Sequence, residues 1–270
     1  MKWKISKISI PVFDLEKSKK FYDFLLCNET YDKKNNRETL DECFISGGDI
    51  ELRLYKLKND VGNNGVIQSR RTYPTLAISN LDLIIKKLDE DGIAYSINKL
   101  NNSITVQETG LNYIELINLE TPMKLSKRKE NNLWNFHHIN LECYNVRSSV
   151  NFISQYLKMK EGTWKAPIEL GKVNINPNQL AIFNLDENHS GVHINKADFT
   201  FGCRNKFMHN PTIGGHPAFN VKDIKTFIAK LKTYEIPFTD AKVYAMPNVH
   251  QVYLFDPNAN IIEINQNVKK

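Results

Sequence analysis

Five side chains in the second half of the sequence have the chemistry to bind a metal ion or to transfer a proton. They are His138, His193, His216, Tyr253 and Glu263. Imidazoles and carboxylates are common metal ligands, and an imidazole also titrates close to neutral pH. Because these residues are far apart along the chain, any shared chemistry depends on the elements that carry them.

The residues around three of these side chains alternate between polar and apolar types, as expected of strands with one buried face. Side chains two residues apart share a strand face. His138, His216 and Glu263 each fall on the polar face. The opposite faces carry Ile139, Leu141, Cys143, Pro217, Phe219, Val221, Ile262 and Ile264. We expect the apolar faces to pack against helices and the polar faces to line a cavity.

These strands belong to a repeated pattern. Residues 5–26 (ISKISIPVFDLEKSKKFYDFLL) and 136–157 (FHHINLECYNVRSSVNFISQYL) both begin with strand-like alternation and continue with helical spacing. Asp14 and Asn145 stand at matching positions, where a short side chain can cap a helix. Residues 72–96 and 215–239 repeat the plan with Asn80 and Asp223 as caps. Strands at 112–120 and 258–266 close each half.

The sequence therefore predicts an α+β protein of four βαβββ modules, paired into two similar domains. The N-terminal domain takes residues 1–120, the linker residues 121–133, and the C-terminal domain residues 134–270. A single module would leave a sheet edge open and one sheet face uncovered. Pairing two modules gives a curved mixed sheet around a cavity, with the helices outside.

This pattern resembles the vicinal oxygen chelate superfamily, which includes glyoxalase I, bleomycin-resistance proteins and extradiol ring-cleavage dioxygenases. The resemblance rests on IPVFDLEKSKKFY (residues 10–22) and on VHQVYLFDPNANIIEIN (residues 249–265). The second segment is similar to the closing Tyr-x-x-Asp-Pro-x-Gly-x-x-x-Glu hairpin of that superfamily, although Ala259 stands where glycine is usual. The resemblance covers nearly the whole chain and implies a two-domain, four-module form.

The resemblance also implies a metal site. In this superfamily the ligands come from the first strands of paired modules and from the last strand, and the matching residues are His138, His216 and Glu263. Two imidazoles and one carboxylate leave positions open for substrate or oxygen, as in mononuclear non-heme iron enzymes. We expect one divalent metal ion, with Fe(II) favoured over Mn, Ni, Zn or Co.

The N-terminal domain has different residues at the matching positions. Lys7, Tyr73 and Glu115 align with the two histidines and the glutamate. A protonated lysine cannot ligate a metal, so we expect this domain to be metal-free and to support the other. A metal-free N-terminal half and a metal-bearing C-terminal half resemble the two-domain extradiol dioxygenases.

Two further residues are candidates for catalysis. His193 faces the cavity by parity, and it could be a fourth ligand, an acid–base group or a residue that only lines the cavity. Tyr253 lies where a tyrosine of the extradiol enzymes hydrogen-bonds the substrate, or else it packs within the sheet. The extradiol signature also places a histidine further upstream than His250, which counts against a standard ring-cleavage enzyme.

Four residues are predicted to contact substrate: Asn140, Asn220, Arg204 and His250. The two asparagines share polar strand faces with the candidate ligands. Arg204 lies in residues 201–216, a predicted long loop, and could either pair with an anionic group or stay solvated. His250 and Tyr253 are three residues apart, so His250 needs a bulge to point inward beside Tyr253.

The leading hypothesis is an Fe(II) extradiol-type dioxygenase that acts on a small substrate with vicinal oxygens. One alternative is a glyoxalase-type lyase or isomerase, in which a carboxylate abstracts a proton and His193 or a neighbour supplies a fourth ligand. Another is a small-molecule binding or resistance module without catalysis. The identity of the substrate is open, and the protein could be a monomer or a homo-oligomer.

The composition excludes several other classes. With 270 residues, 41% of them hydrophobic, the chain can bury a core and is not a disordered protein. Its net charge of +6 is dispersed, which argues against nucleic-acid binding. We expect a cytoplasmic protein without membrane contact, because we see no apolar span and no signal peptide. Cys27, Cys43, Cys143 and Cys203 are widely spaced and are expected to be reduced.

Overall fold

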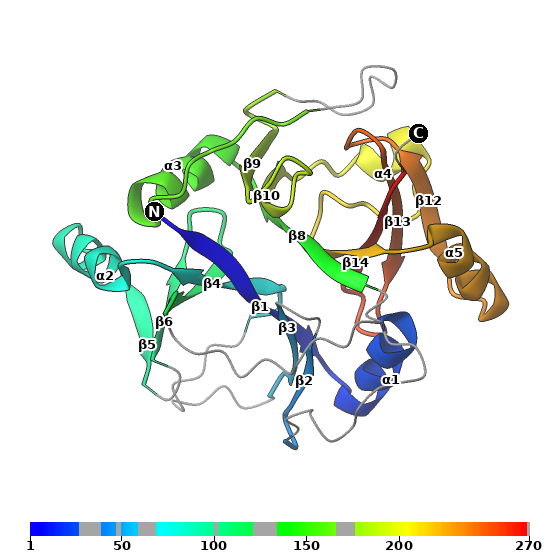
Figure 1. The fold of residues 1–270 in the computed structure, drawn as a ribbon, viewed down its shortest axis with the longest axis horizontal. Helices are drawn as coiled ribbons and strands as arrows, with labels where there is room; N and C mark the ends of the chain where they lie inside the picture. The colour runs from blue at the N-terminus through cyan, green and yellow to red at the C-terminus, as the bar shows by residue number, and fades with distance from the viewer. Residues whose placement is uncertain are drawn as a thin grey trace.

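The computed structural model describes residues 1–26, 39–46, 50–58, 69–99, 102–120, 134–165 and 176–268. These residues form two seven-stranded sheets with helices outside them (Figure 1). The predicted linker and Cys27 lie outside the described residues, so the linker stays a prediction. In the described part of the chain, no helix is both long enough and apolar enough to span a membrane.

The N-terminal sheet joins two modules through its central strands. The first module comprises β1 (Trp3–Val12), α1 (Leu15–Leu26), β2 (Glu42–Ser46) and β3 (Glu51–Lys56). The second comprises β4 (Tyr73–Ile78), α2 (Leu81–Glu90), β5 (Tyr95–Asn98), β6 (Ser103–Gln107) and β7 (Tyr113–Asn118). The strand order is β2-β3-β1-β4-β7-β6-β5. The central pair β1 and β4 is antiparallel, while β3 and β7 run parallel to their inner neighbours.

The C-terminal sheet has the same plan. Its first module comprises β8 (Trp134–Cys143), α3 (Val146–Tyr156), β9 (Leu180–Asn184) and β10 (Gly191–Lys196). Its second comprises β11 (His216–Val221), α5 (Ile224–Thr233), β12 (Phe238–Val243), β13 (Val249–Phe255) and β14 (Ile261–Asn267). The order β9-β10-β8-β11-β14-β13-β12 matches the N-terminal sheet strand for strand. The predicted pairing of modules in an α+β fold is therefore confirmed.

Two details differ from the sequence-based expectation. Among the described residues, the first and third modules have two strands after the helix instead of three. Residues 201–216, predicted as a long loop, contain the short helix α4 (Phe201–Asn205). Neither difference changes the pairing of the modules, which is made by β1 with β4 and by β8 with β11.

Short polar side chains start three of the four predicted helices. An Oδ1 atom accepts a backbone N–H in each case: Asp14 from Lys17 at 2.9 Å, Asn145 from Ser148 at 3.1 Å, and Asp223 from Lys225 at 2.9 Å. The prediction for Asn80 is wrong, because its side chain makes no capping hydrogen bond. Its backbone is left-handed, with φ 61°, whereas a capping residue is typically extended.

The helices pair across the two domains. On one side α1 meets α5, where the ring centroids of Phe24 and Tyr234 lie 4.6 Å apart. Lys230 Nζ also donates to the carbonyl oxygen of Phe24. On the other side α2 meets α3, and Tyr156 Oη donates to Asp91 Oδ2 at 3.2 Å (Figure 1). Because α1 corresponds to α3 and α2 to α5, the two contacts are equivalent.

The apolar strand faces pack as predicted. Ile139, Leu141, Phe219, Ile262 and Ile264 are each at most 1% exposed and belong to one core cluster. That cluster also contains residues of the N-terminal sheet, so the two domains share a continuous core. The polar faces of the same strands are left to form the site described below.

The turn between β13 and β14 holds an alanine in a left-handed conformation. Asp256 Oδ1 accepts the backbone N–H groups of Asn258 and Asn260, each at 2.8 Å. Asn258 Oδ1 in turn accepts the N–H of Phe13, which ties the turn to the N-terminal domain at 2.8 Å. Ala259 has φ 63°, a region that costs an L-residue about 1–2 kcal/mol.

Replacing Ala259 with glycine is therefore expected to raise the free energy of unfolding by about 1 kcal/mol. Glycine removes the Cβ crowding, which outweighs its greater freedom in the unfolded chain. A matched control is Ala229→Gly in the exposed face of α5, which should lower stability by about 1 kcal/mol. Urea unfolding measures the stability of both variants. A loss of stability in Ala259→Gly would show that the backbone at Ala259 is not strained.

Candidate metal centre

Three neighbouring strands of the C-terminal sheet bring His138, His216 and Glu263 together. His138 lies in β8, His216 begins β11, and Glu263 lies in β14. Ala218 of β11 pairs with His138 on one side and with Glu263 on the other. Its methyl group leaves room for the two longer side chains to meet above it. His216 is two residues before Ala218 and points to the same face.

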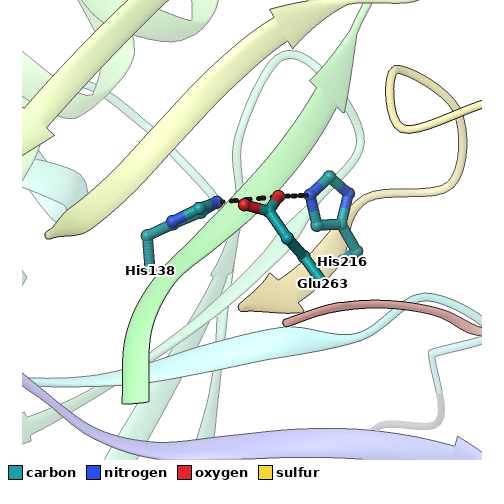
Figure 2. A group of neighbouring side chains, drawn as sticks. All are labelled: His138, His216 and Glu263. Carbon is teal, nitrogen blue, oxygen red and sulfur yellow. Dashed lines mark hydrogen bonds and ion pairs between the residues drawn. The ribbon is translucent and has the colours of Figure 1, made fainter. Parts of the chain in front are cut away.

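The three side chains present their donor atoms to one point (Figure 2). Glu263 Oε2 lies 2.9 Å from His216 Nε2 and 3.5 Å from His138 Nε2. One donor atom from each residue lies within 4.8 Å of the others, and each residue is 1% exposed. Ligand atoms about 2.1 Å from one metal ion are about 3.0–3.4 Å apart in octahedral or tetrahedral geometry. The cluster therefore fits a divalent metal ion.

The electrostatics of the cluster also suit a cation. Burial acts to raise the pKa of Glu263, but its interactions with His138 and His216 outweigh burial and hold the pKa well below its usual value. Burial lowers the pKa of His138. An ionised carboxylate beside a neutral imidazole is the protonation state that a metal ligand set requires.

Side chains of β13 hold the carboxylate in place. Gln251 Nε2 donates to Glu263 Oε1 at 2.9 Å and to Tyr253 Oη at 3.1 Å. The hydroxyl groups of Tyr253 and Tyr244 lie 2.9 Å apart. Sequence reasoning missed Gln251, although its position two residues before Tyr253 placed it on the same strand face. It also missed Tyr244, which follows β12 in a segment without regular spacing.

His193 in β10 stacks on the candidate ligand His138. Their ring centroids are 3.8 Å apart and the ring planes differ by 19°. His193 Nε2 lies 2.7 Å from the carbonyl oxygen of His189, which can only accept, so Nε2 carries the proton. Burial keeps the pKa of His193 well below its usual value. The ring is therefore neutral, with a lone pair on Nδ1.

A second histidine next to the ligands escaped the sequence analysis. His137 precedes His138, and parity placed it on the opposite strand face. The structure instead brings the two Nδ1 atoms to 2.7 Å. Burial, together with His138, lowers the pKa of His137 to about 4, so its ring is neutral at pH 7.

A pocket reaches the donor cluster at His138 and Glu263, whereas His216 is not among the residues that line it. Its volume is about 740 Å³, open solvent at the mouth included. Six predicted site residues line it: His138, Asn140, His193, Arg204, Tyr253 and Glu263. Aromatic side chains that were not predicted also line it: Trp164, Phe201 and Tyr244. The side chain of Arg204 is 59% exposed at the wall, where its guanidinium pairs with Asp198 and donates to Thr200 Oγ1 at 3.0 Å.

Asn220 and His250, which were also predicted to contact substrate, do not line this pocket. Asn220 is four residues beyond His216, about 13 Å along the strand, and lines a separate pocket. His250 Nε2 lies 2.6 Å from Asp240 Oδ1 of the neighbouring strand. Because β13 pairs with β14 without a bulge, His250 and Tyr253 keep opposite faces.

The N-terminal sheet holds an ion pair at the equivalent position. Thr75 pairs with Lys7 on one side and with Glu115 on the other, as Ala218 pairs with the two ligands. Lys7 Nζ lies 3.0 Å from Glu115 Oε2. Burial acts to raise the pKa of Glu115, but Lys7 and hydrogen bonds from Thr75 and Ser103 outweigh burial and lower the pKa. An ammonium group thus neutralises this buried carboxylate.

No protein-family model and no curated protein matches this sequence. Solved structures do match. A Mn(II)-bound glyoxalase from Novosphingobium aromaticivorans aligns with 98% of this chain and 82% of its own, at TM-score 0.64 and 13% identity. The 2,3-dioxygenase LapB from Pseudomonas sp. KL28 aligns with 98% of this chain and 92% of its own, at TM-score 0.64 and 11% identity.

Homoprotocatechuate 2,3-dioxygenase from Arthrobacter globiformis gives a similar match. It aligns with 97% of this chain and 79% of its own, at TM-score 0.64 and 14% identity. At such low identity these likenesses show the fold. The chain has the two-domain vicinal oxygen chelate fold that the sequence predicted.

Replacing Lys7 with methionine is expected to lower the free energy of unfolding by about 3–5 kcal/mol at pH 7. The methionine keeps the apolar stem but leaves the buried charge of Glu115 without its cation. The double variant Lys7→Met, Glu115→Gln removes both charges and should recover part of the loss. Urea unfolding measures all three proteins.

The Lys7–Glu115 ion pair also predicts that the stability of the protein depends on pH. Because the folded-state pKa of Glu115 is lowered, the stability that Lys7 provides is fully present above the unfolded-state pKa of about 4.3. It is lost as the pH falls through the folded-state value. The difference in the free energy of unfolding between wild type and Lys7→Met should therefore shrink as the pH falls from about 5 to about 3. An unchanged difference would contradict the ion pair.

Proposed function

We propose that this protein is a mononuclear divalent-metal enzyme of the vicinal oxygen chelate type. The reaction we favour is an extradiol-type dioxygenation that uses Fe(II) and a small substrate with two adjacent oxygens. The observation that carries the proposal is the meeting of three buried donor atoms from His138, His216 and Glu263, beside a pocket that His138 and Glu263 line. Three protein ligands leave coordination positions free for other groups.

A bound divalent ion would supply Lewis acidity, and Fe(II) would add reactivity toward dioxygen. The chain supplies the remaining functions. Gln251 holds Glu263 Oε1, which leaves Oε2 directed at the two imidazoles. The lone pair on His193 Nδ1 can take a proton from a substrate hydroxyl group. Trp164 lies edge-on to His193, with ring centroids 4.8 Å apart, and shields it from bulk water.

The number of donors supports the dioxygenase over the glyoxalase type. A glyoxalase-type site often has a fourth protein ligand, and His193 or a neighbour was the candidate. In the described part of the chain the donor cluster contains three residues, and His193 is not among them. The likeness to a Mn(II)-bound glyoxalase keeps a lyase or isomerase as the second candidate.

Metal analysis of protein purified without oxygen tests the proposal. We expect about one iron per chain in the wild type and loss of iron in His138→Ala, because one of three ligands is gone. His250→Ala is the matched control, since His250 lies in the same sheet but outside the pocket. This control should keep its iron. Oxygen uptake should then appear with catechol-like compounds.

Other results would change the assignment. Manganese, nickel, zinc or cobalt that depends on His138 would favour the lyase or isomerase. No metal in either protein, even after reconstitution, would overturn the metal centre and favour a module that only binds small molecules.

Replacing His193 with glutamine tests the acid–base role. We expect metal content to stay unchanged, because His193 is not among the three donors. The kcat should fall about 10²–10³-fold, as expected when a general acid–base group is lost. Steady-state kinetics beside metal analysis measures both quantities. Unchanged turnover would exclude His193 as the proton carrier.

A further inference from the structure

A β-bulge in β8 lets two consecutive histidines meet. His138 pairs with Ala218 and Phe136 pairs with Phe219, so two neighbours in β11 face residues two apart in β8. His137 is the extra residue and has no partner in the ladder. A bulge re-aims the side chain that it carries. It therefore explains how neighbouring residues, which face opposite ways in a regular strand, reach an Nδ1–Nδ1 distance of 2.7 Å.

The hydrogen bonds of His137 define which atoms carry protons. Its Nε2 lies 2.9 Å from the carbonyl oxygen of Asn188. A carbonyl oxygen only accepts, so Nε2 of His137 carries a proton. The contact between the two Nδ1 atoms needs one donor and one acceptor. With His138 as the donor, its proton is on Nδ1, and its Nε2, which is directed at Glu263, is left free to bind a metal.

We propose that His137 is a positioning residue that keeps His138 in its metal-binding tautomer. The backbone carbonyl of Asn188 orients His137, and His137 then orients His138. This proposal rests on the metal centre proposed above. Hydrogen bonds to the outer nitrogen of a ligating imidazole control its tautomer and ring orientation, and their loss typically weakens metal binding 10–100-fold, in order of magnitude.

Two comparisons within the molecule support a specific role. The outer nitrogen of the second candidate ligand, His216 Nδ1, is buried without a hydrogen-bond partner in the described structure. The N-terminal sheet has an equivalent bulge at Ser6, next to Lys7, and there the hydroxyl donates to the carbonyl oxygen of Thr75 at 3.0 Å. The bulge thus occurs in both sheets, but only in the C-terminal sheet, beside the candidate ligands, is the bulged residue a histidine.

The position of His137 allows its effect to be separated from substrate binding. His137 and Asn188 line a pocket of their own, which shares no lining residue with the pocket that leads to the donors. A substitution at His137 therefore replaces no residue that lines the substrate pocket, and it acts on the centre through His138.

We call the hydrogen-bonded chain from the Asn188 carbonyl through His137 to His138 the relay. Two variants of nearly equal size, His137→Asn and His137→Leu, test it. Asparagine keeps an acceptor, Oδ1, close to the position of the histidine Nδ1, whereas leucine has no acceptor. Nitrogen NMR of metal-free protein with labelled histidine reports the tautomer of each ring. We expect His138 to carry its proton on Nδ1 in the wild type and in His137→Asn. In His137→Leu we expect this preference to be lost.

Mn(II) affinity, measured by competition with a chelator, gives the second readout. We expect His137→Asn to bind Mn(II) like the wild type and His137→Leu to bind it about 10–100-fold more weakly. Equal thermal unfolding of the metal-free proteins excludes a general loss of folding. A wild-type His138 protonated on Nε2, or unchanged affinity in His137→Leu, would overturn the relay. If no protein binds Mn(II), the metal centre fails, and the tautomer of His138 still decides the relay.

Discussion

A carboxylate cannot stay ionised in the middle of a packed sheet unless nearby groups compensate for the water it has lost. Glu263, 1% exposed, meets this constraint with His216 Nε2 2.9 Å from one oxygen and the amide of Gln251 2.9 Å from the other. Glu115 meets the same constraint in the other domain through Lys7. The two domains thus share the problem of a buried charge and differ in the groups that solve it.

The register of the strands makes these solutions possible. In both sheets the central residue between the two key side chains is short, Ala218 in one and Thr75 in the other. A longer side chain there would keep the flanking groups apart. The bulges at His137 and Ser6 occur one residue before the key position of the first strand in each sheet. Strand pairing, bulge and buried charge therefore recur together, as one unit of the duplicated module.

The sequence contains most of the information for the fold and for the centre of the site. Polar and apolar residues alternate along a strand wherever one of its faces is buried. This alternation was enough to place His138, His216 and Glu263 on polar faces. The same rule failed at His137, because a bulge breaks the period and depends on pairing with a distant strand. It also could not show how far along a strand a residue lies, and Asn220 lines a pocket separate from the one that His138 and Glu263 line. Tyr244 and Trp164 come from segments without periodicity, so only the folded chain brings them to the pocket wall.

The Lys7–Glu115 pair has a consequence for how the two halves respond to their surroundings. An ammonium group attached to the chain is present in every copy of the protein at any metal concentration. A bound ion is present only in proportion to its supply, and it stabilises the fold by mass action. With a metal in the C-terminal centre, the N-terminal half would keep its stability under metal starvation, while the C-terminal half would lose part of its own. The protein would then respond to metal scarcity in one domain, with the other as a constant support.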